Sequence, residues 1–160
     1  MIVTDRYIVR SGRPVRVIVA RVKPGSDLLR SLQKVAAEEG ITSGVIVSGV
    51  GLLKQARLRN CKRLPDEYPI TDANRTYLSF EKPLEILSIS GNVTLAEGEP
   101  LVHAHLTLSK VEGDEITVIG GHLIEGCVVF GFSEFAILEL EGIEMVKRFD
   151  EETQTLQLFE

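Results

Sequence analysis

The sequence has no tryptophan, only two cysteines, and no apolar run approaching the roughly 18–20 residues needed to span a bilayer. Its first residues, MIVTDRYIVR, alternate like a strand and lack the order of charge, apolar core and cleavage site of a signal peptide. Cys61 and Cys127 lie far apart and form no CxxC motif, so we interpret them as reduced thiols, with a disulfide as the alternative. These absences predict a cytoplasmic protein with no membrane partner.

Signatures of nucleotide binding are missing as well. The glycine-rich run GVIVSGVG (44–51) contains neither the Gly-Lys-Ser/Thr of a phosphate loop nor a GxGxxG pattern. We interpret it as a buried strand followed by a bulge or tight turn at Gly49 and Gly51. No internal repeat or low-complexity tract divides the chain, and its 160 residues predict a single domain, 1–160.

Basic residues are scarce in the second part of the chain. Residues 1–63 hold 13 Lys and Arg against 4 Asp and Glu, a net charge of +9, whereas residues 64–160 hold 5 against 19, a net charge of −14. This asymmetry favours packing of the two parts against each other or against neighbouring subunits, with a basic face for an anionic partner as the alternative. The overall net charge of −5 opposes binding to nucleic acid at long range.

One local basic cluster lies between residues 54 and 63. It has no interleaved aromatic side chains, so it lacks the stacking platform of a protein that binds single strands. We interpret it as a solvated strand face or a row of inter-subunit salt bridges, and a weak nucleic-acid contact is the alternative. The residues assigned to that contact, called the basic cluster below, are Arg57, Arg59, Lys62 and Arg63.

One stretch has helical spacing. Pro24-Gly25-Ser26 opens a helix over about residues 26–39, in which apolar side chains form one stripe. Ser26 or Asp27 can cap its start, and Gly40 lies where a left-handed residue would end it.

The remaining segments mostly have the pattern of strands. Residues 2–9 and 15–22 are expected to form a hairpin around Ser11-Gly12, and residues 64–83 to form a long irregular segment. The pattern predicts an α+β fold, with a mainly antiparallel or mixed sheet of about 7–9 strands and the helix packed on it. One helix cannot cover so many strands, so we expect an oligomer. Further strands are expected over 84–94, 101–109, 113–122, 127–140 and near 156–159.

All three histidines of the chain lie within residues 99–125. His103 and His105 share one face of an alternating segment, where side chains two residues apart are roughly 6–7 Å from each other. Residues 113–117 predict a turn into a second strand that ends at Gly120-Gly121-His122, and such a hairpin brings His122 beside the other two. Imidazole nitrogens bind zinc at about 2.0–2.1 Å, so the three side chains are a candidate metal site.

The alternative is that these are ordinary histidines on the polar face of a strand. The sequence does not define a fourth ligand; water, Glu125 or Cys127 could serve. An open fourth position is typical of a reactive or ligand-accepting site rather than a closed structural one. The ligand type suits zinc but also copper, iron and nickel, so the metal itself stays open.

Six segments of the chain together resemble the PPC domain, the plant and prokaryote conserved domain, over nearly the whole length. They are PGSDL (24–28), GVIVSGVG (44–51), LEILSISG (84–91), VHAHLTL (102–108), GGHL (120–123) and EFAILE (134–139).

The resemblance implies a mixed-sheet fold, a homotrimer and a three-histidine site for a metal or small ligand. In plants this domain accompanies AT-hook nuclear proteins, and single-domain prokaryotic members are often called DNA-binding proteins with a PD1-like motif. Here Ser11-Gly12-Arg13-Pro14 matches only part of an AT-hook, which places direct DNA binding in doubt.

Three functions follow as hypotheses. The first is an oligomeric interaction or regulatory module loosely linked to DNA binding. The second is a metal-dependent enzyme or ligand-binding protein that uses His103, His105 and His122. An enzyme would also need a general base, for which Glu85, Glu125 and Glu134 are candidates. The third is a nonspecific DNA binder that uses the basic cluster.

Overall fold

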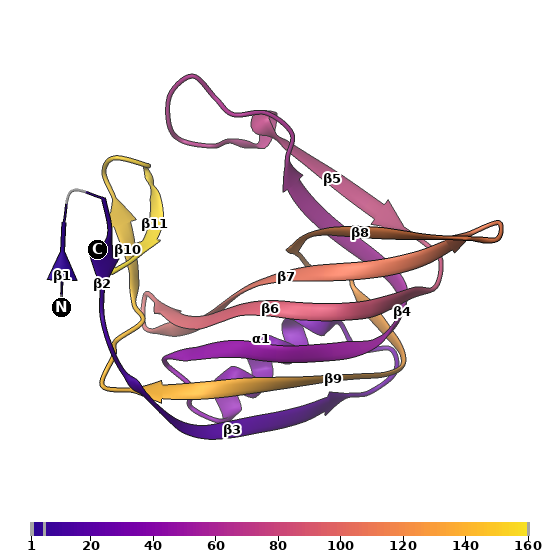
Figure 1. The fold of residues 1–160 in the computed structure, drawn as a ribbon, viewed down its shortest axis with the longest axis horizontal. Helices are drawn as coiled ribbons and strands as arrows, with labels where there is room; N and C mark the ends of the chain where they lie inside the picture. The colour runs from indigo at the N-terminus through magenta and orange to yellow at the C-terminus, as the bar shows by residue number, and fades with distance from the viewer. Residues whose placement is uncertain (1, 5, 160) are drawn as a thin grey trace.

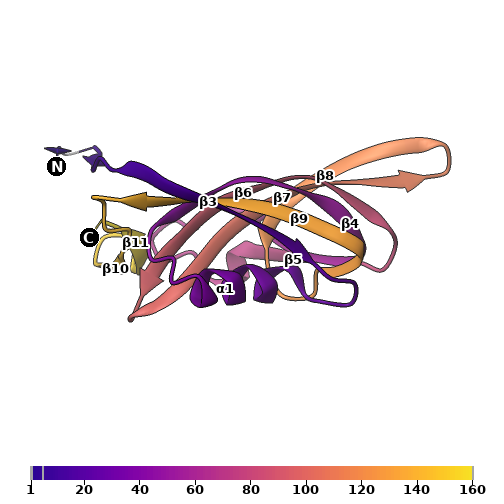
Figure 2. The ribbon, with the colours of Figure 1, turned by 90° about the horizontal axis from the view of Figure 1, so that it is seen from below.

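The computed structural model describes residues 2–4 and 6–159, and Figures 1 and 2 present its α+β fold. Seven strands form the main sheet, in the order β3-β9-β4-β6-β7-β8, with β5 also paired to β4. Every pairing in it is antiparallel. Its strands are β3 (Arg13–Val22), β4 (Gly44–Cys61), β5 (Arg75–Phe80), β6 (Leu84–Ala96), β7 (Glu99–Glu112), β8 (Glu115–Leu123) and β9 (Val128–Glu141).

The long strand β4 organises this sheet. Its first half lies between β9 and β6, whereas its second half pairs with β5 and, through Leu58 and Arg59, with the end of β8. Register shifts between Ile46 and Ser48 and again around Leu53 mark bulges, which bend a strand and increase its twist. The sheet therefore curls until β8 returns to β4, as the bent path of β4 in Figure 1 indicates.

The single α-helix of the described residues, α1 (Leu28–Glu38), covers one face of the sheet (Figure 2). Asp27 caps it by accepting a hydrogen bond from the Arg30 backbone N–H at 3.0 Å. Gly40 ends it with a φ of +66°, as expected from the sequence. The buried side chains of the helix pack into one core with β4, β6, β7 and β9, and each fully buried leucine contributes about 1.5–3 kcal/mol.

The opposite face of the sheet carries exposed apolar side chains. Alternation along β3 turns Ile18 and Ala20 towards the core and leaves Val15, Val17 and Val19 on the outer face, with Val19 74% exposed. Phe130 and Phe132 of β9 are also exposed. We call this set, with Val47 and Val50 of β4, the outer apolar face.

Two small antiparallel hairpins lie together at one end of the molecule (Figure 1). They are formed by β1 (Ile2–Val3) with β2 (Ile8–Val9), and by β10 (Lys147–Asp150) with β11 (Thr155–Leu158). Across the described ranges, 2–4 and 6–159, no helix has the length and apolarity that a membrane crossing requires.

Two sequence-based expectations need correction. The hairpin of 2–9 with 15–22 is wrong, because β2 pairs with β1 while β3 pairs with β9, whose apolar residues continue the core. The irregular stretch 64–83 contains a short 3₁₀ helix (Asp72–Asn74) and β5, which pairs along β4 despite its polar composition. Of the bulge or tight turn expected at the end of the run 44–51, the structure has the bulge, because the register shifts after Gly51 while β4 continues to Cys61.

Candidate metal centre

Two neighbouring strands, β7 and β8, position the histidines. His103 and His105 lie on the same face of β7, and the hairpin register places His122 of β8 directly opposite His105. The predicted convergence therefore follows from the pleat of β7 and from the pairing of β7 with β8. His103 and His122 are half-buried, and His105 is exposed.

The imidazole rings are close enough to share one ion. Ring centroids lie 5.3 Å apart for His103 and His105, 4.9 Å for His103 and His122, and 5.3 Å for His105 and His122. The Nε2 atoms of His103 and His105 are 3.3 Å apart, and one ligand nitrogen from each of the three rings lies within 4.8 Å of the others. Two nitrogens bound to a tetrahedral zinc at about 2.0–2.1 Å would lie about 3.3–3.4 Å apart. The pair of His103 and His105 already has that spacing.

The environment keeps two of the rings neutral at physiological pH. Burial, followed by the positive charges of Arg59 and other neighbours, lowers the pKa of His122 to about 4. Burial is also the main cause of the lowered pKa of His103, with a contribution from Lys147. Neutral imidazole is the form that coordinates a metal, so these rings need not lose a proton to bind one.

One glycine, Gly121, lets β8 approach β4 beside His122. A Cβ on Gly121 would lie 2.5 Å from Oδ1 of Asn60, so a larger residue here would require the Asn60 amide to move. Asn60 in turn donates from Nδ2 to the Gly120 carbonyl at 2.9 Å. The sequence analysis did not identify Asn60, although the Gly-Gly pair before His122 was a signal that another group lies close there.

A pocket of about 550 Å³ opens in front of the histidines. Its walls come from the end of β4, the loop before β5, and the hairpin of β10 and β11, which are far apart in sequence. Besides the histidines, the lining residues are Arg59, Asn60, Cys61, Tyr68, Ile70, Arg75, Thr153, Thr155 and Gln157. The volume lies in the range of small-molecule sites.

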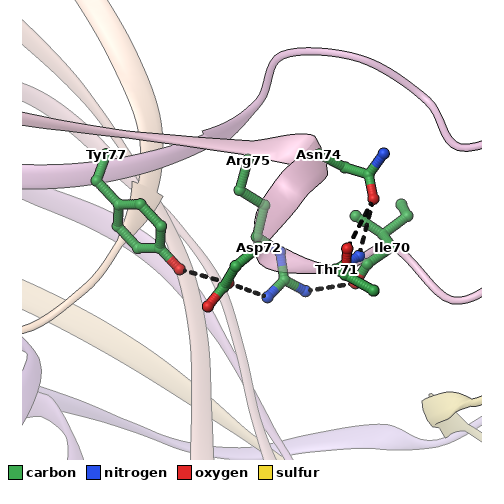
Figure 3. Close-up of polar contacts among 6 residues, drawn as sticks. All are labelled: Ile70, Thr71, Asp72, Asn74, Arg75 and Tyr77. Atoms are coloured by element: carbon green, nitrogen blue, oxygen red, sulfur yellow. Dashed lines mark hydrogen bonds and ion pairs between the residues drawn. The ribbon is translucent and has the colours of Figure 1, made fainter.

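Arg75 is held at this pocket by the turn before β5 (Figure 3). Its guanidinium donates to the Ile70 carbonyl and to Oδ1 of Asp72, each at 3.2 Å. Tyr77 donates its hydroxyl to the same oxygen at 2.8 Å, and these contacts lower the pKa of Asp72. The turn is itself closed by the Asn74 side chain, whose Oδ1 accepts from the Thr71 N–H at 3.0 Å.

The suggested fourth ligands and general bases do not join the cluster. Glu125 pairs with Arg30 at 2.7 Å, and the Cys127 thiol is buried against the backbone of Arg57. Neither Glu85 nor Glu134 lines the pocket. Burial raises the pKa of Cys127 to about 11, so its thiolate is not accessible at neutral pH.

The basic cluster does not form one uniform face. Arg59 lines the histidine pocket, whereas the Arg57 guanidinium lies over the ring of Tyr77, 5.8 Å from its centroid. Lys62 and Arg63 follow the end of β4 and are exposed. Their assignment to a nucleic-acid contact stays a prediction.

Two positively charged residues near the histidines had no signal in the sequence. Arg75 lies in the stretch expected to be irregular, and Lys147 in a segment for which no structure was expected. The Nζ of Lys147 lies 3.5 Å from Nδ1 of His103. Burial lowers the pKa of Lys147.

The fold and the cluster together define an α+β domain with a three-histidine group at the closing edge of its sheet. The sequence pattern of the Plants and Prokaryotes Conserved (PCC) domain, also written PPC, matches residues 9–141. The chain belongs to this family, as the six quoted segments predicted.

Solved and curated relatives agree with this assignment. A metal-containing protein of Archaeoglobus fulgidus is 28% identical, with a TM-score of 0.77 over 96% of this chain and 100% of that one. A PPC protein of Pyrococcus horikoshii is 29% identical, with a TM-score of 0.75 over 94% and 96% of the two chains. Bifunctional protein GlmU of Synechococcus sp. (strain JA-3-3Ab) is 31% identical over 92% of this chain, but this chain spans only 22% of its length.

Proposed function

We propose that this protein is an oligomeric PCC-domain module that binds a divalent transition metal, zinc best of all, through His103, His105 and His122. The observation that supports it most is the convergence of three ring nitrogens within 4.8 Å. Three histidines with an open fourth position are the ligand set of zinc sites that accept water or a ligand. The metal-containing relative from Archaeoglobus fulgidus supports the same function.

Metal analysis of protein purified without a histidine tag tests this function. We expect one zinc ion per chain, and we expect His105→Ala to lose it while keeping the fold, because the side chain is exposed and its role is local. Thr107→Ala is the matched control, since Thr107 lies two residues further along the same face of β7. Wild-type protein that takes up no metal from zinc-containing medium would contradict the proposal.

A binding role is favoured over catalysis by the residues around the cluster. Within the described part of the chain, no carboxylate lines the pocket, so the general base that an enzyme would need is not supplied by the candidate glutamates. The alternative of a metal-dependent enzyme would then depend on Lys147 or on metal-bound water. If the protein is an enzyme, activity that persists in Lys147→Met would indicate that metal-bound water, and not Lys147, is the reactive group.

The oligomer we propose is the homotrimer implied by the family resemblance. The outer apolar face supports self-association, because an exposed cluster of valine and phenylalanine side chains is costly in water. Light scattering should return a mass three times the 17.7 kDa of one chain. Val19→Lys should lower that mass, while Val111→Lys, at an exposed position near the end of β7, should not. A monomer at micromolar concentration would refute the trimer.

A further inference from the structure

The pocket in front of the histidines is positively charged. Arg59 and Arg75 line it, and the Nζ of Lys147 lies 3.5 Å from Nδ1 of His103. Within residues 2–4 and 6–159, the guanidinium of Arg59 has no hydrogen bond or ion pair, although the residue is half-buried. The carboxylate nearest to these groups, that of Asp72, is already bonded to Arg75 and Tyr77.

Strand pairing places these cations beside the metal ligands. Arg59 is the register partner of His122 across the seam between β4 and β8. Arg75 is the register partner of Cys61, two residues after Arg59 on β4. Both guanidiniums therefore reach the same pocket from fixed strands.

A metal ion at this site would add to an existing positive charge. Neutral imidazoles bring no negative charge to offset a divalent ion, unlike carboxylate or thiolate ligands. The ion would repel Arg59, Arg75 and Lys147, and in a partly desolvated pocket that repulsion is not fully screened. A negatively charged ligand would relieve it.

We propose that the pocket binds a small molecule through an oxyanion group, a carboxylate or a phosphate, that bridges the metal and the two arginines. One oxygen would take the fourth position on the metal, and the others would accept hydrogen bonds from Arg59 and Arg75. Arginine suits this role because its planar donors match both groups. The inference rests on the proposed metal site and names the class of ligand that it takes.

The pocket favours a small molecule over a nucleic-acid backbone. It is concave and about 550 Å³ in volume, which matches a metabolite-sized ligand. Tyr68 and Ile70 add apolar surface beside the charged groups, so the ligand would carry a short carbon skeleton as well as its oxyanion.

Thermodynamic linkage between metal binding and anion binding gives this proposal a measurable consequence. If the anion bridges metal and arginine, each ligand must raise the affinity for the other by the same factor. We therefore expect succinate or inorganic phosphate to tighten zinc binding about tenfold, a coupling of about 1.4 kcal/mol. Whichever of the two has the larger effect identifies the oxyanion.

Isothermal titration with zinc, in the absence and presence of succinate or phosphate, tests this proposal on the full chain. Arg59→Gln should abolish the tightening by anion and leave zinc binding alone unchanged or stronger, because it removes a repelling charge. Arg59→Lys should restore part of the tightening. Lys62→Gln, an exposed change outside the pocket, is the control and should behave like wild type.

The outcomes separate this inference from the proposed function. Zinc binding that neither anion strengthens would overturn the oxyanion proposal and leave the metal site intact. No zinc binding at all would overturn the metal site itself. Anion binding that is as tight without zinc as with it would also overturn the bridge between metal and arginine. So would anion binding that Lys62→Gln weakens as much as Arg59→Gln does, because either result would show diffuse attraction to positive charge.

Discussion

Replacing Gly121 by alanine should disturb the metal centre without touching a metal ligand. The new Cβ would meet the Asn60 side chain at 2.5 Å, well inside van der Waals contact. Asn60 would have to rotate away, and its 2.9 Å hydrogen bond to the Gly120 carbonyl would break. His122 directly follows Gly121, so the distortion would reach a ligand.

The expected cost follows from these two effects. Because the new Cβ meets only the free end of a partly exposed side chain, which can move aside, Gly121→Ala should cost little more than the lost hydrogen bond, about 0.5–1.5 kcal/mol. Removing the Asn60 amide by Asn60→Ala should cost only about 0.5–1 kcal/mol, because the bond is exposed to solvent. In the double variant the clash is absent. Its free energy of unfolding should therefore lie within a few tenths of a kcal/mol of that of Asn60→Ala alone.

Urea unfolding of the wild type, Gly121→Ala, Asn60→Ala and the double variant, all at the same protein concentration, measures this coupling. Zinc titration of the same proteins measures its effect on the histidine site. Zinc affinity should fall in Gly121→Ala and recover in the double variant. Strictly additive free energies would refute the reasoning, because they would show that Gly121 and Asn60 do not compete for the same space.

Three further predictions concern charge and exposure. In metal-free protein, the lowered pKa values of His103 and His122 mean that the unfolded chain binds more protons as pH falls from about 6.5 towards 4. The free energy of unfolding should therefore decrease in that window, and His122→Gln should flatten the decrease in urea titrations. Maleimide should label exposed Cys61 in the native protein but not buried Cys127, whose pKa is raised to about 11; mass spectrometry showing the reverse would contradict the burial. DNA binding through the basic cluster should neutralise only ~3–5 phosphates and fade near physiological salt, and nanomolar, salt-resistant retention would contradict it.

Local pattern was sufficient for most of the elements. The helix was expected from its apolar stripe, from Asp27 and from Gly40, and the structure has it between those residues. The histidine hairpin was expected from alternation and a turn at 113–117, and β7 and β8 pair there. These features depend on contacts between residues near in sequence, so the pattern of a short segment specifies them.

Long-range pairing was not predictable in the same way. The partner of β3 is β9, more than a hundred residues away, and nothing in the sequence of β3 distinguishes it from a nearer strand. The strand β5 was missed because it is short, follows a proline-containing polar stretch, and is held by its pairing with the distant strand β4.

The sequence by itself determined that three imidazoles would converge, because the strand period and one hairpin are enough to bring them together. Only the tertiary structure decided what surrounds them. The curl of the sheet joins β8 to the far half of β4 and places Arg59 beside His122, while the turn before β5 and the last hairpin bring Arg75 and Lys147 to the same site. The histidines are local in sequence, whereas the positive charges around them come from three distant segments, and only burial and strand pairing across the whole chain could bring those together.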